Sequence, residues 1–211
     1  MRVKGLLKMK KVNLYKSGEE KFGYITSNLY FIFQNKITKI NSFYKFVESD
    51  LYKRKFKTLI DIGCGTGNII NDLALKNKNL NLFGIDPSLY MIEIANKNKQ
   101  KNTTFNVGSS TYIPFKIKFD IIISALSMHH WNDKVGSLIY LSHHLNKNGE
   151  IIIYEFLKTK GKGITEKIEY FLAKKHMVYK SDLINYGNKA NLNIKNIKIK
   201  QNFIRVIYTK K

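Results

Sequence analysis

The segment with the clearest chemical meaning in this chain is Asp61-Ile62-Gly63-Cys64-Gly65-Thr66-Gly67-Asn68. It follows the apolar run 58–60 and precedes apolar residues at helical spacing, so we predict a strand, a tight turn and a helix. Glycines at alternate positions let the backbone turn and approach a ligand without a Cβ, and the first N–H groups of a helix lack partners. The segment therefore predicts a nucleotide site, although a purely structural turn would use the same glycines.

The spacing of the glycines, and the acid before them, narrow the choice of nucleotide. A dinucleotide fingerprint has the form G-x-G-x-x-G, whereas this chain has G-x-G-x-G with Asp61 two positions before the first glycine. A carboxylate there suits a cationic ligand. The pattern resembles the first motif of class I S-adenosylmethionine-dependent methyltransferases, whose acid lies near the ammonium end of the cofactor. The resemblance implies a cofactor site that includes Asp61, Gly63, Cys64, Gly65 and Gly67.

A second acid stands where a nucleotide-binding sheet needs one. Residues 80–85 have the pattern of a short strand, and Asp86 follows it. An acid at the carboxyl end of the second strand of an open α/β sheet can accept hydrogen bonds from both ribose hydroxyls. We predict Asp86 as the ribose ligand, with Pro87 beside the cofactor. Asp86-Pro87-Ser88 is also typical of a helix start with proline in the first turn, and the two roles are compatible.

Two later segments resemble the same family. Gly108-Ser109-Ser110-Thr111-Tyr112-Ile113-Pro114-Phe115 is similar to the segment that contacts adenine, with Ser109 in place of the usual acid. Ser109 and Ser110 are predicted contacts, and an ordinary loop is the alternative. Ser124-Ala125-Leu126-Ser127-Met128-His129-His130-Trp131 resembles the paired-histidine segment of type 11 enzymes, the ubiquinone- and menaquinone-biosynthesis-like branch. The resemblance implies that Ala125 and Leu126 pass beside the cofactor.

The adjacent histidines are candidates for a general base. Methyl transfer from a sulfonium depends mostly on positioning, and a base is needed only where the nucleophile carries a proton. With an ordinary pKa of about 6.5, His129 or His130 could take that proton, while packing or a helix start is the alternative role. No cysteine or carboxylate cluster lies near the histidines at zinc-site spacing, so no metal is expected. Tyr24, His176 and Tyr179 lie in flanks where the family has substrate-side loops, which predicts acceptor contacts unless they belong to the core.

Alternating helical and strand-like segments must position these residues. A long amphipathic helix is predicted over 28–50. Strands are predicted at 58–60, 80–85, 103–107, 118–124, 150–156, 193–200 and 203–209. Helices are predicted after the glycine turn, after Ser88, near 166–175, after Asp182, and along an inner face of Val135, Leu138, Ile139, Ser142 and Leu145 that ends at Asn148-Gly149. The pattern and the resemblance imply an α/β fold: a Rossmann-like, doubly wound, seven-stranded sheet, mostly parallel with its last strand antiparallel, after an N-terminal helical extension.

Length and composition predict a single methyltransferase domain. A chain of 211 residues that is 44% hydrophobic can build one well-buried core. We expect a helical cap over 1–55, a cofactor-binding core over 56–156, and substrate-side helices with a terminal hairpin over 157–211. The single cysteine excludes an intramolecular disulfide, and the chain has neither an apolar run of membrane-spanning length nor a signal-like start. The expected location is the cytoplasm.

The charge leaves the substrate open. The net charge is +22, of which 1–55 carries +9, 56–156 carries +2 and 157–211 carries +11. Nearly all of the basic residues are lysines, as an AT-rich genome would produce, so a solvated basic surface and an anionic substrate both fit. The leading hypothesis is methyl transfer to a small-molecule acceptor. The alternatives are a tRNA or nucleic-acid methyltransferase that uses the basic flanks, and a non-catalytic partner protein that kept the fold; the oligomeric state is not predicted.

Overall fold

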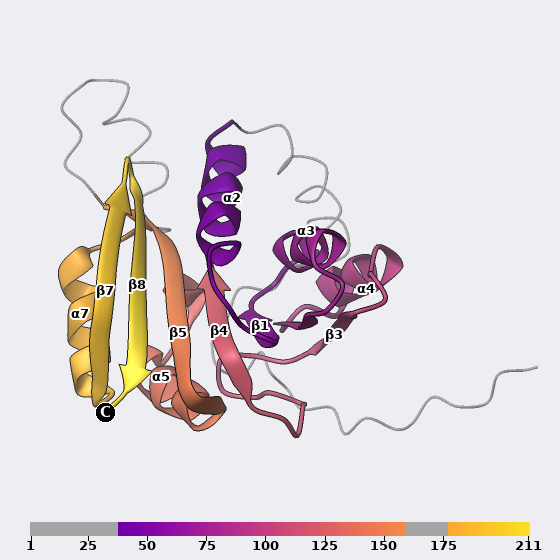
Figure 1. Ribbon diagram of the computed structural model, residues 1–211. Helices are drawn as coiled ribbons and strands as arrows, with labels where there is room; N and C mark the ends of the chain where they lie inside the picture. The colour runs from indigo at the N-terminus through magenta and orange to yellow at the C-terminus, as the bar shows by residue number, and fades with distance from the viewer. Residues whose placement is uncertain (1–37, 159–176) are drawn as a thin grey trace, which may run out of the picture.

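The computed structural model describes residues 38–158 and 177–211, which form an open, twisted sheet with helices on both faces (Figure 1). The strand order is β3-β2-β1-β4-β5-β8-β7, and a short β6 pairs with β5 off this path. The strands are β1 Thr58–Ile62, β2 Asn81–Asp86, β3 Thr103–Val107, β4 Phe119–Ala125, β5 Leu145–Leu157, β6 Met177–Val178, β7 Leu192–Lys200 and β8 Phe203–Lys210. β1 to β5 run parallel, whereas β8 is antiparallel to β5 and β7. The predicted fold class is confirmed.

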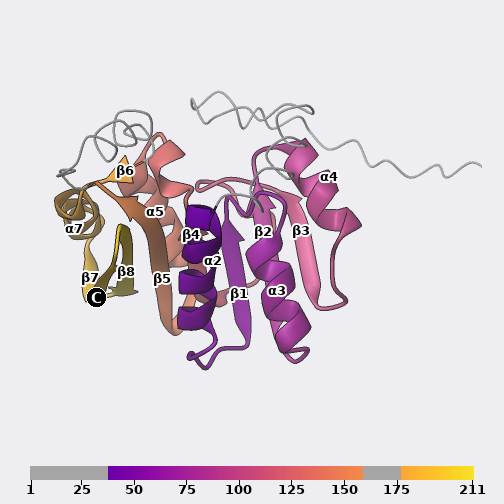
Figure 2. The ribbon, with the colours of Figure 1, turned by 90° about the horizontal axis from the view of Figure 1, so that it is seen from above.

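The helices divide between the two faces of the sheet, as the view from above shows (Figure 2). They are α2 Thr38–Leu51, α3 Asn68–Lys76, α4 Leu89–Lys97, α5 Lys134–His143 and α7 Lys180–Lys189, with a 3₁₀ turn at Met128–His130. Successive strand residues serve opposite faces: Ile122 packs into the core under α5 and α7, and Ile121 and Ile123 pack into the core under α2, α3 and α4. β4 is therefore covered on both faces, which explains its unbroken apolar run.

The segment around α5 differs from the prediction in two ways. Ile139 is 40% exposed, and Leu141 is the fully buried residue instead. α5 also ends at His143, because the His144 N–H caps the carbonyls of Leu141 and Ser142, so Asn148-Gly149 does not end the helix. β5 already pairs with β4 at Leu145, and the four residues before Glu150 bulge out with Asn148 at φ 65°. Sequence periodicity could not separate the last turn of a helix from the start of a bulged strand.

Charged side chains tie α2 to the sheet. Asp50 of α2 accepts hydrogen bonds from the Tyr154 hydroxyl at 2.8 Å, from Arg54 at 3.0 Å and from Arg205 of β8. Arg54 also donates to Glu150 of β5 at 2.6 Å. Burial alone would raise the pKa of Asp50, but the Tyr154 hydroxyl and the two guanidinium groups hold it below its ordinary value. Two of the three arginines of the chain thus serve this junction.

Apolar packing completes the α2 junction. Phe43, Phe46, Val47 and Leu51 are buried, whereas Tyr44, whose helical spacing within the predicted helix 28–50 marks it as an inner-face residue, is only partly buried. The part of the predicted helix before residue 38 and the predicted helix near 166–175 lie outside the described residues. None of the helices in the described ranges has the length and apolar character to cross a membrane.

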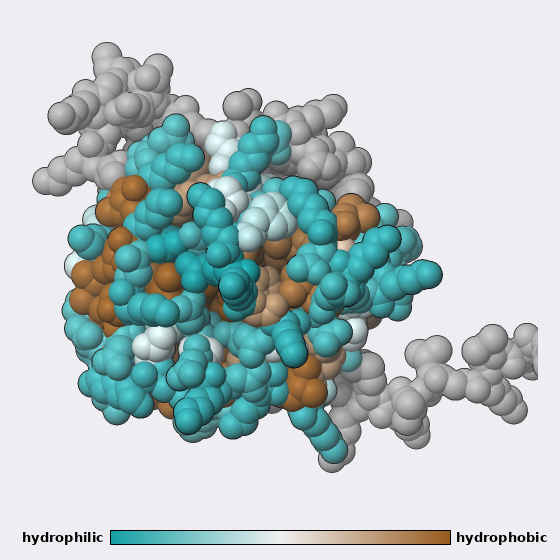
Figure 3. Space-filling view, in the orientation of Figure 1, coloured by the Kyte–Doolittle hydropathy of each residue, from teal (hydrophilic) through white to brown (hydrophobic). Residues whose placement is uncertain are grey.

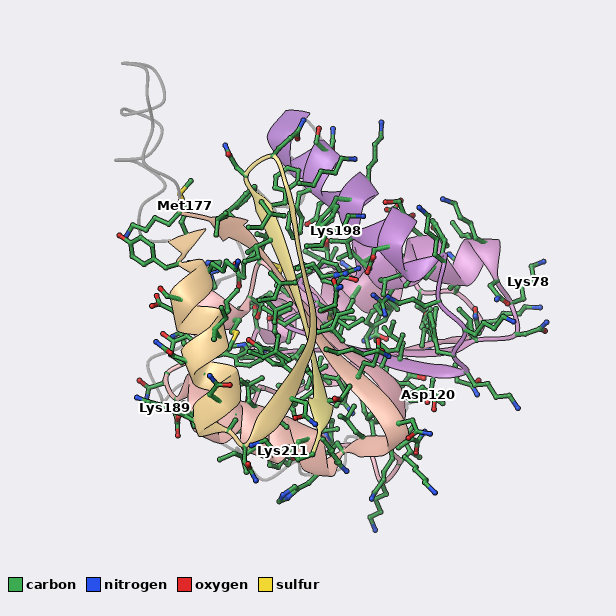
Figure 4. The ribbon with its side chains drawn as sticks, turned by 60° about the vertical axis from the view of Figure 1, so that its left-hand side comes forward. Lys78, Asp120, Met177, Lys189, Lys198 and Lys211 are labelled. Atoms are coloured by element: carbon green, nitrogen blue, oxygen red, sulfur yellow. The ribbon has the colours of Figure 1, made fainter. Side chains whose placement is uncertain are left out.

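The surface is mostly hydrophilic on the face that Figure 3 shows, with small and separate hydrophobic areas. Lysines account for much of the charge. Lys189 of α7, Lys198 of β7 and Lys211 at the end of the chain stand on the outside of the same part of the molecule (Figure 4). They lie beyond β5, on the side of the sheet away from the glycine turn.

Candidate active site

The glycine turn follows β1 and is held against the end of β2. The N–H groups of Gly63 and Cys64 donate to the Ile85 carbonyl at 2.8 and 2.9 Å. Gly63, Gly65 and Gly67 have φ of 79°, 53° and 78°, a region that favours glycine. Gly63 and Gly67 also need their lack of a side chain, because an added Cβ would lie 1.9 Å from Ser127 Oγ and 2.7 Å from the Phe105 ring. Gly65 faces open space, so a ligand can approach its backbone.

Asp86 braces this turn from the end of β2. One carboxylate oxygen accepts the Gly65 N–H at 3.0 Å and the other accepts the Ser88 N–H at 2.8 Å. Burial raises the pKa of Asp86 to about 6, although both N–H groups act in the opposite direction. The helix cap is Ser88, whose hydroxyl accepts the Met91 N–H at 3.4 Å, so Pro87 precedes the helix and is not in its first turn as predicted.

Asp61 at the end of β1 is the least satisfied group of the site. Its side chain is 2% exposed, and among the described residues nothing hydrogen-bonds to its Oδ1. Burial, and then the neighbouring charge of Asp86, raise its pKa to about 8. A buried carboxylate without a partner is costly, and a ligand with a cationic group or N–H donors would relieve that cost.

One cavity at the carboxyl ends of the parallel strands collects most of the predicted residues. Its lining includes Asp61, Gly63, Cys64, Gly65, Asp86, Pro87, Ser109, Ser110, Ala125, Leu126 and His130. Gly67 and His129 belong to the same segments but are not among the lining residues. This edge, where the strand order reverses next to β1, is where open α/β sheets bind their ligands.

The two predicted serines differ in what their hydroxyls do. Ser109 Oγ lies 3.2 Å from Thr111 Oγ1, and the Ser109 and Tyr112 backbones pair across a tight turn. Ser110 Oγ already accepts a hydrogen bond from Ser137 of α5 at 2.8 Å. Ser110 therefore mainly anchors the loop to α5, and Ser109 is the better placed of the two for a polar ligand group.

The strand end at Leu126 is backbone-strained. Leu126 has φ 54°, which is unfavourable for a side chain of that size, and its N–H is held by the Tyr154 carbonyl at 3.0 Å. The surrounding structure must stabilise this conformation, which occurs preferentially at functional sites. It turns the chain from β4 into the 3₁₀ turn that carries the histidines.

The paired histidines take different positions. His130 lines the cavity, whereas Nδ1 of His129 lies 2.9 Å from the carboxylate of Glu155, which is fully buried on β5. Their rings are in contact, with centroids 3.9 Å apart and planes tilted by 47°. Of the two predicted bases, only His130 faces the cavity among the described residues.

The sequence prediction missed Tyr44, Ser127, Trp131 and Glu155. Trp131, 3% exposed, lines the cavity next to the histidines and could have been included as their neighbour. Tyr44 reaches the lining from α2; its helical spacing marked it as an inner-face residue and gave no sign of a place in the cavity. Burial raises the pKa of the Cys64 thiol well above its ordinary value, which disfavours the thiolate that a nucleophile would need.

Of the three predicted acceptor contacts, only Tyr179 lies among the described residues. Tyr179 stands outside the cavity lining, is 47% exposed, and has Lys158 Nζ 4.6 Å above its ring. Tyr24 and His176 lie outside the described residues. In the described ranges, no three side chains of the metal-binding types come together.

Comparison with known proteins places the chain in a family. Residues 53–197 match the methyltransferase domain family. An uncharacterized methyltransferase of Staphylococcus carnosus is 32% identical over 115 residues, 54% of each chain, and the demethylmenaquinone methyltransferase of Thermotoga maritima is 32% identical over 117 residues, 55% of this chain and 51% of that one. The chain thus spans about half the length of the curated relatives it matches.

A solved structure agrees at the level of the fold. The TehB-like methyltransferase of Corynebacterium glutamicum aligns with a TM-score of 0.65 at 17% identity, over 90% of this chain and all of that one. The family uses S-adenosylmethionine as its cofactor. The chain belongs to the class I S-adenosylmethionine-dependent methyltransferase family.

Proposed function

We propose that this protein transfers a methyl group from S-adenosylmethionine to a small-molecule acceptor. The observation that carries the proposal is the buried Asp61 carboxylate with an unpartnered oxygen, beside the open backbone of Gly65 at the carboxyl edge of the sheet. The cofactor has a cationic amino-acid end, and this is the kind of group that the pair can accept.

The remaining cofactor contacts follow the cavity lining. Each oxygen of Asp86 accepts one backbone N–H, from Gly65 or Ser88, and can accept a further hydrogen bond. Asp86 would use this remaining capacity to bind the ribose hydroxyls. Ser109 would bind the adenine edge, and Ala125 and Leu126 would pass beside the cofactor. When bound, S-adenosylmethionine supplies an electrophilic methyl group whose bonding electrons stay with sulfur as the acceptor's nucleophile forms its new bond.

The acceptor side has a different chemistry. His130 would take the proton that a hydroxyl, amine or acidic C–H acceptor loses, becoming an imidazolium. Tyr44 and Trp131 give this end of the cavity aromatic faces, which suit a small, partly apolar acceptor. Tyr44 comes from the segment predicted as a cap, which supports the proposal that the flanks 1–55 and 157–211 shape the acceptor site.

A second candidate is a tRNA acceptor. It is favoured by the net charge of +9 and +11 on the two flanks. The scarcity of arginine, with Arg54 and Arg205 already committed to the α2 junction, counts against recognition of phosphates by the described residues.

Calorimetric titration tests the proposal directly. S-adenosylmethionine and S-adenosylhomocysteine should bind with micromolar affinity, and NAD should not. Asp86→Ala should weaken binding by about 1.5–3 kcal/mol, since hydrogen bonds to a charged group are lost. Asp72→Ala, which removes an exposed acid on α3, is the matched control and should leave the affinity unchanged.

Each other outcome has a definite meaning. If neither adenosyl compound binds the wild type, the non-catalytic partner reading is favoured. If both bind and Asp86→Ala has no effect, the ribose assignment is wrong. Once an acceptor is identified, His130→Ala should lower turnover while cofactor binding is retained.

A further inference from the structure

Glu155 is a buried carboxylate that the cofactor contacts do not use. It is fully buried on β5, and both of its oxygens meet one residue: Oε1 accepts the His129 backbone N–H at 3.2 Å and Oε2 lies 2.9 Å from His129 Nδ1. The negative charge of Glu155 also acts on Lys134 of α5. Burial lowers the pKa of Lys134, and the charge of Glu155 opposes that shift. A carboxylate at such depth is stable only with donors of this kind.

His129 connects this carboxylate to the cavity. Its side chain is 7% exposed, its ring contacts that of His130 with centroids 3.9 Å apart and planes tilted by 47°, and the 3₁₀ turn Met128–His130 contains both residues. The His129 ring therefore lies between Glu155 and the ring of His130, which lines the cavity. Because the two rings are in contact, the orientation of His129 restricts the orientations open to His130.

We infer that Glu155 is a positioning residue for the acceptor side: it fixes His129 as the tautomer with its proton on Nδ1, and the fixed ring orients His130 in the cavity. This inference rests on the proposed function. The two oxygens have only acceptor capacity when ionised, so both facing atoms of His129 must be donors. The tautomer is thereby determined by the hydrogen bond, as it commonly is for functional histidines.

The substitution Glu155→Gln tests this arrangement with little change of shape. An amide has a single oxygen, so it can accept from the backbone N–H or from Nδ1–H but not from both. If the oxygen keeps the backbone N–H, the amide NH₂ faces Nδ1 and favours the opposite tautomer. Glu150→Gln is the matched control, because Glu150 lies on the same strand, is 8% exposed, and bonds to Arg54 and Lys195 instead of a histidine.

The measurement is ¹⁵N-edited NMR of the imidazole rings at pH 8, with and without S-adenosylhomocysteine. The chain has five histidines, so His129→Gln and His130→Gln variants assign the two signals. In the wild type and in Glu150→Gln, His129 should be a single Nδ1–H tautomer and the His130 signals should shift on ligand addition. In Glu155→Gln, the tautomer should become mixed or inverted and the His130 shift should change, while the affinity for S-adenosylhomocysteine stays within about threefold.

The outcomes separate this inference from the proposed function. A wild-type His129 with its proton on Nε2, or with mixed tautomers, overturns the inference even if Glu155→Gln does not fold. An unchanged tautomer and His130 shift in a folded Glu155→Gln protein overturn it as well. Absence of S-adenosylhomocysteine binding to the wild type overturns the proposed function, and the tautomer of His129 can still be measured.

Discussion

Asp61 and Asp86 place two buried carboxyl groups in the site that we propose for the cationic cofactor. Asp86 accepts hydrogen bonds from two backbone N–H groups, whereas one oxygen of Asp61 has no hydrogen-bond partner among the described residues. The pKa of Asp86 is about 6 and that of Asp61 is about 8, so Asp86 ionises first as the pH rises. Near neutral pH the ligand-free site therefore still holds a proton on Asp61.

Because Asp61 ionises only above neutral pH, we predict that the affinity for the cofactor increases with pH. The cationic end of S-adenosylmethionine favours the ionised form of Asp61, so binding at pH 6 must release a proton and is weakened. Affinity should rise by up to about tenfold per pH unit between pH 6 and 8 and level off above the Asp61 pKa of about 8. Calorimetry in two buffers of different ionisation enthalpy measures both the affinity and the proton release. Asp61→Asn should bind weakly with a flat profile; a wild-type profile that is flat over this range would contradict the assignment.

The glycine turn shows how one short element divides its residues between folding and binding. An added Cβ at Gly63 would enter the side chain of Ser127, while one at Gly65 would enter the space proposed for the ligand. The same chemical change at positions two residues apart should therefore have different consequences.

We predict that Gly63→Ala acts on stability and Gly65→Ala acts mainly on binding. Gly63→Ala should lower the free energy of unfolding by about 2 kcal/mol or more, since it combines a left-handed φ with a clash. Gly65→Ala should cost only about 1 kcal/mol of stability but weaken S-adenosylhomocysteine at least about tenfold. Urea unfolding and calorimetry on both variants make the comparison. Equal losses of stability would contradict the difference predicted for folding, and an unchanged affinity of Gly65→Ala for S-adenosylhomocysteine would mean that the space beside Gly65 is not a ligand site.

The α2 junction is the second element whose parts can be tested. Arg205 is 7% exposed and is compensated by Asp50 and Asn196. Asp50→Ala should lower the free energy of unfolding by about 3–5 kcal/mol, because it leaves a buried cation without its carboxylate. The double variant Asp50→Ala with Arg205→Met should recover much of the loss, and Glu93→Ala, at an exposed site on α4, should be neutral. The measurement is urea denaturation at pH 7, and no recovery in the double variant would exclude the charge explanation.

The sequence predicted the individual helices and strands well and the residues at which they begin and end less well. β3 coincides with the predicted 103–107, and Ile69, Ile70, Leu73 and Ala74, the apolar residues at helical spacing after the glycine turn, are all buried in α3, together with the unmarked Asn71. Local patterns carry this information because each element buries one face. Glu155 and Tyr44 could not be predicted, since their roles depend on which distant strand or helix lies opposite them. The glycine turn and Asp86 could be predicted, because the motif itself has the geometry of the site.

The whole molecule combines a strongly basic chain with a cavity at the carboxyl edge of the sheet. The net charge is +22, and the exposed lysines Lys189, Lys198 and Lys211 lie on the outer side of the sheet, away from the glycine turn (Figure 4). Such a surface attracts nucleic acid without any need for recognition in the cavity.

We therefore predict that bulk tRNA binds at low salt but without coupling to the cofactor. The affinity should fall steeply, by a factor of about 10³ or more between 50 and 200 mM salt if six or more phosphates are contacted. S-adenosylhomocysteine should leave the tRNA affinity unchanged. Fluorescence anisotropy over a salt series, with and without the ligand, makes the measurement. Salt-resistant binding that strengthens with the ligand would favour the tRNA acceptor over the small molecule.

Cys64 gives the protein a built-in reporter. It is the only cysteine in the chain, it lies in the glycine turn, and it lines the cavity. Because burial raises the pKa of its thiol well above the ordinary value, a disulfide reagent should react slowly with the closed site and quickly with any state in which the turn opens. The rate of thiol labelling thus follows the opening of the turn, and its suppression by added ligands offers a screen for acceptors that needs no assay of methyl transfer.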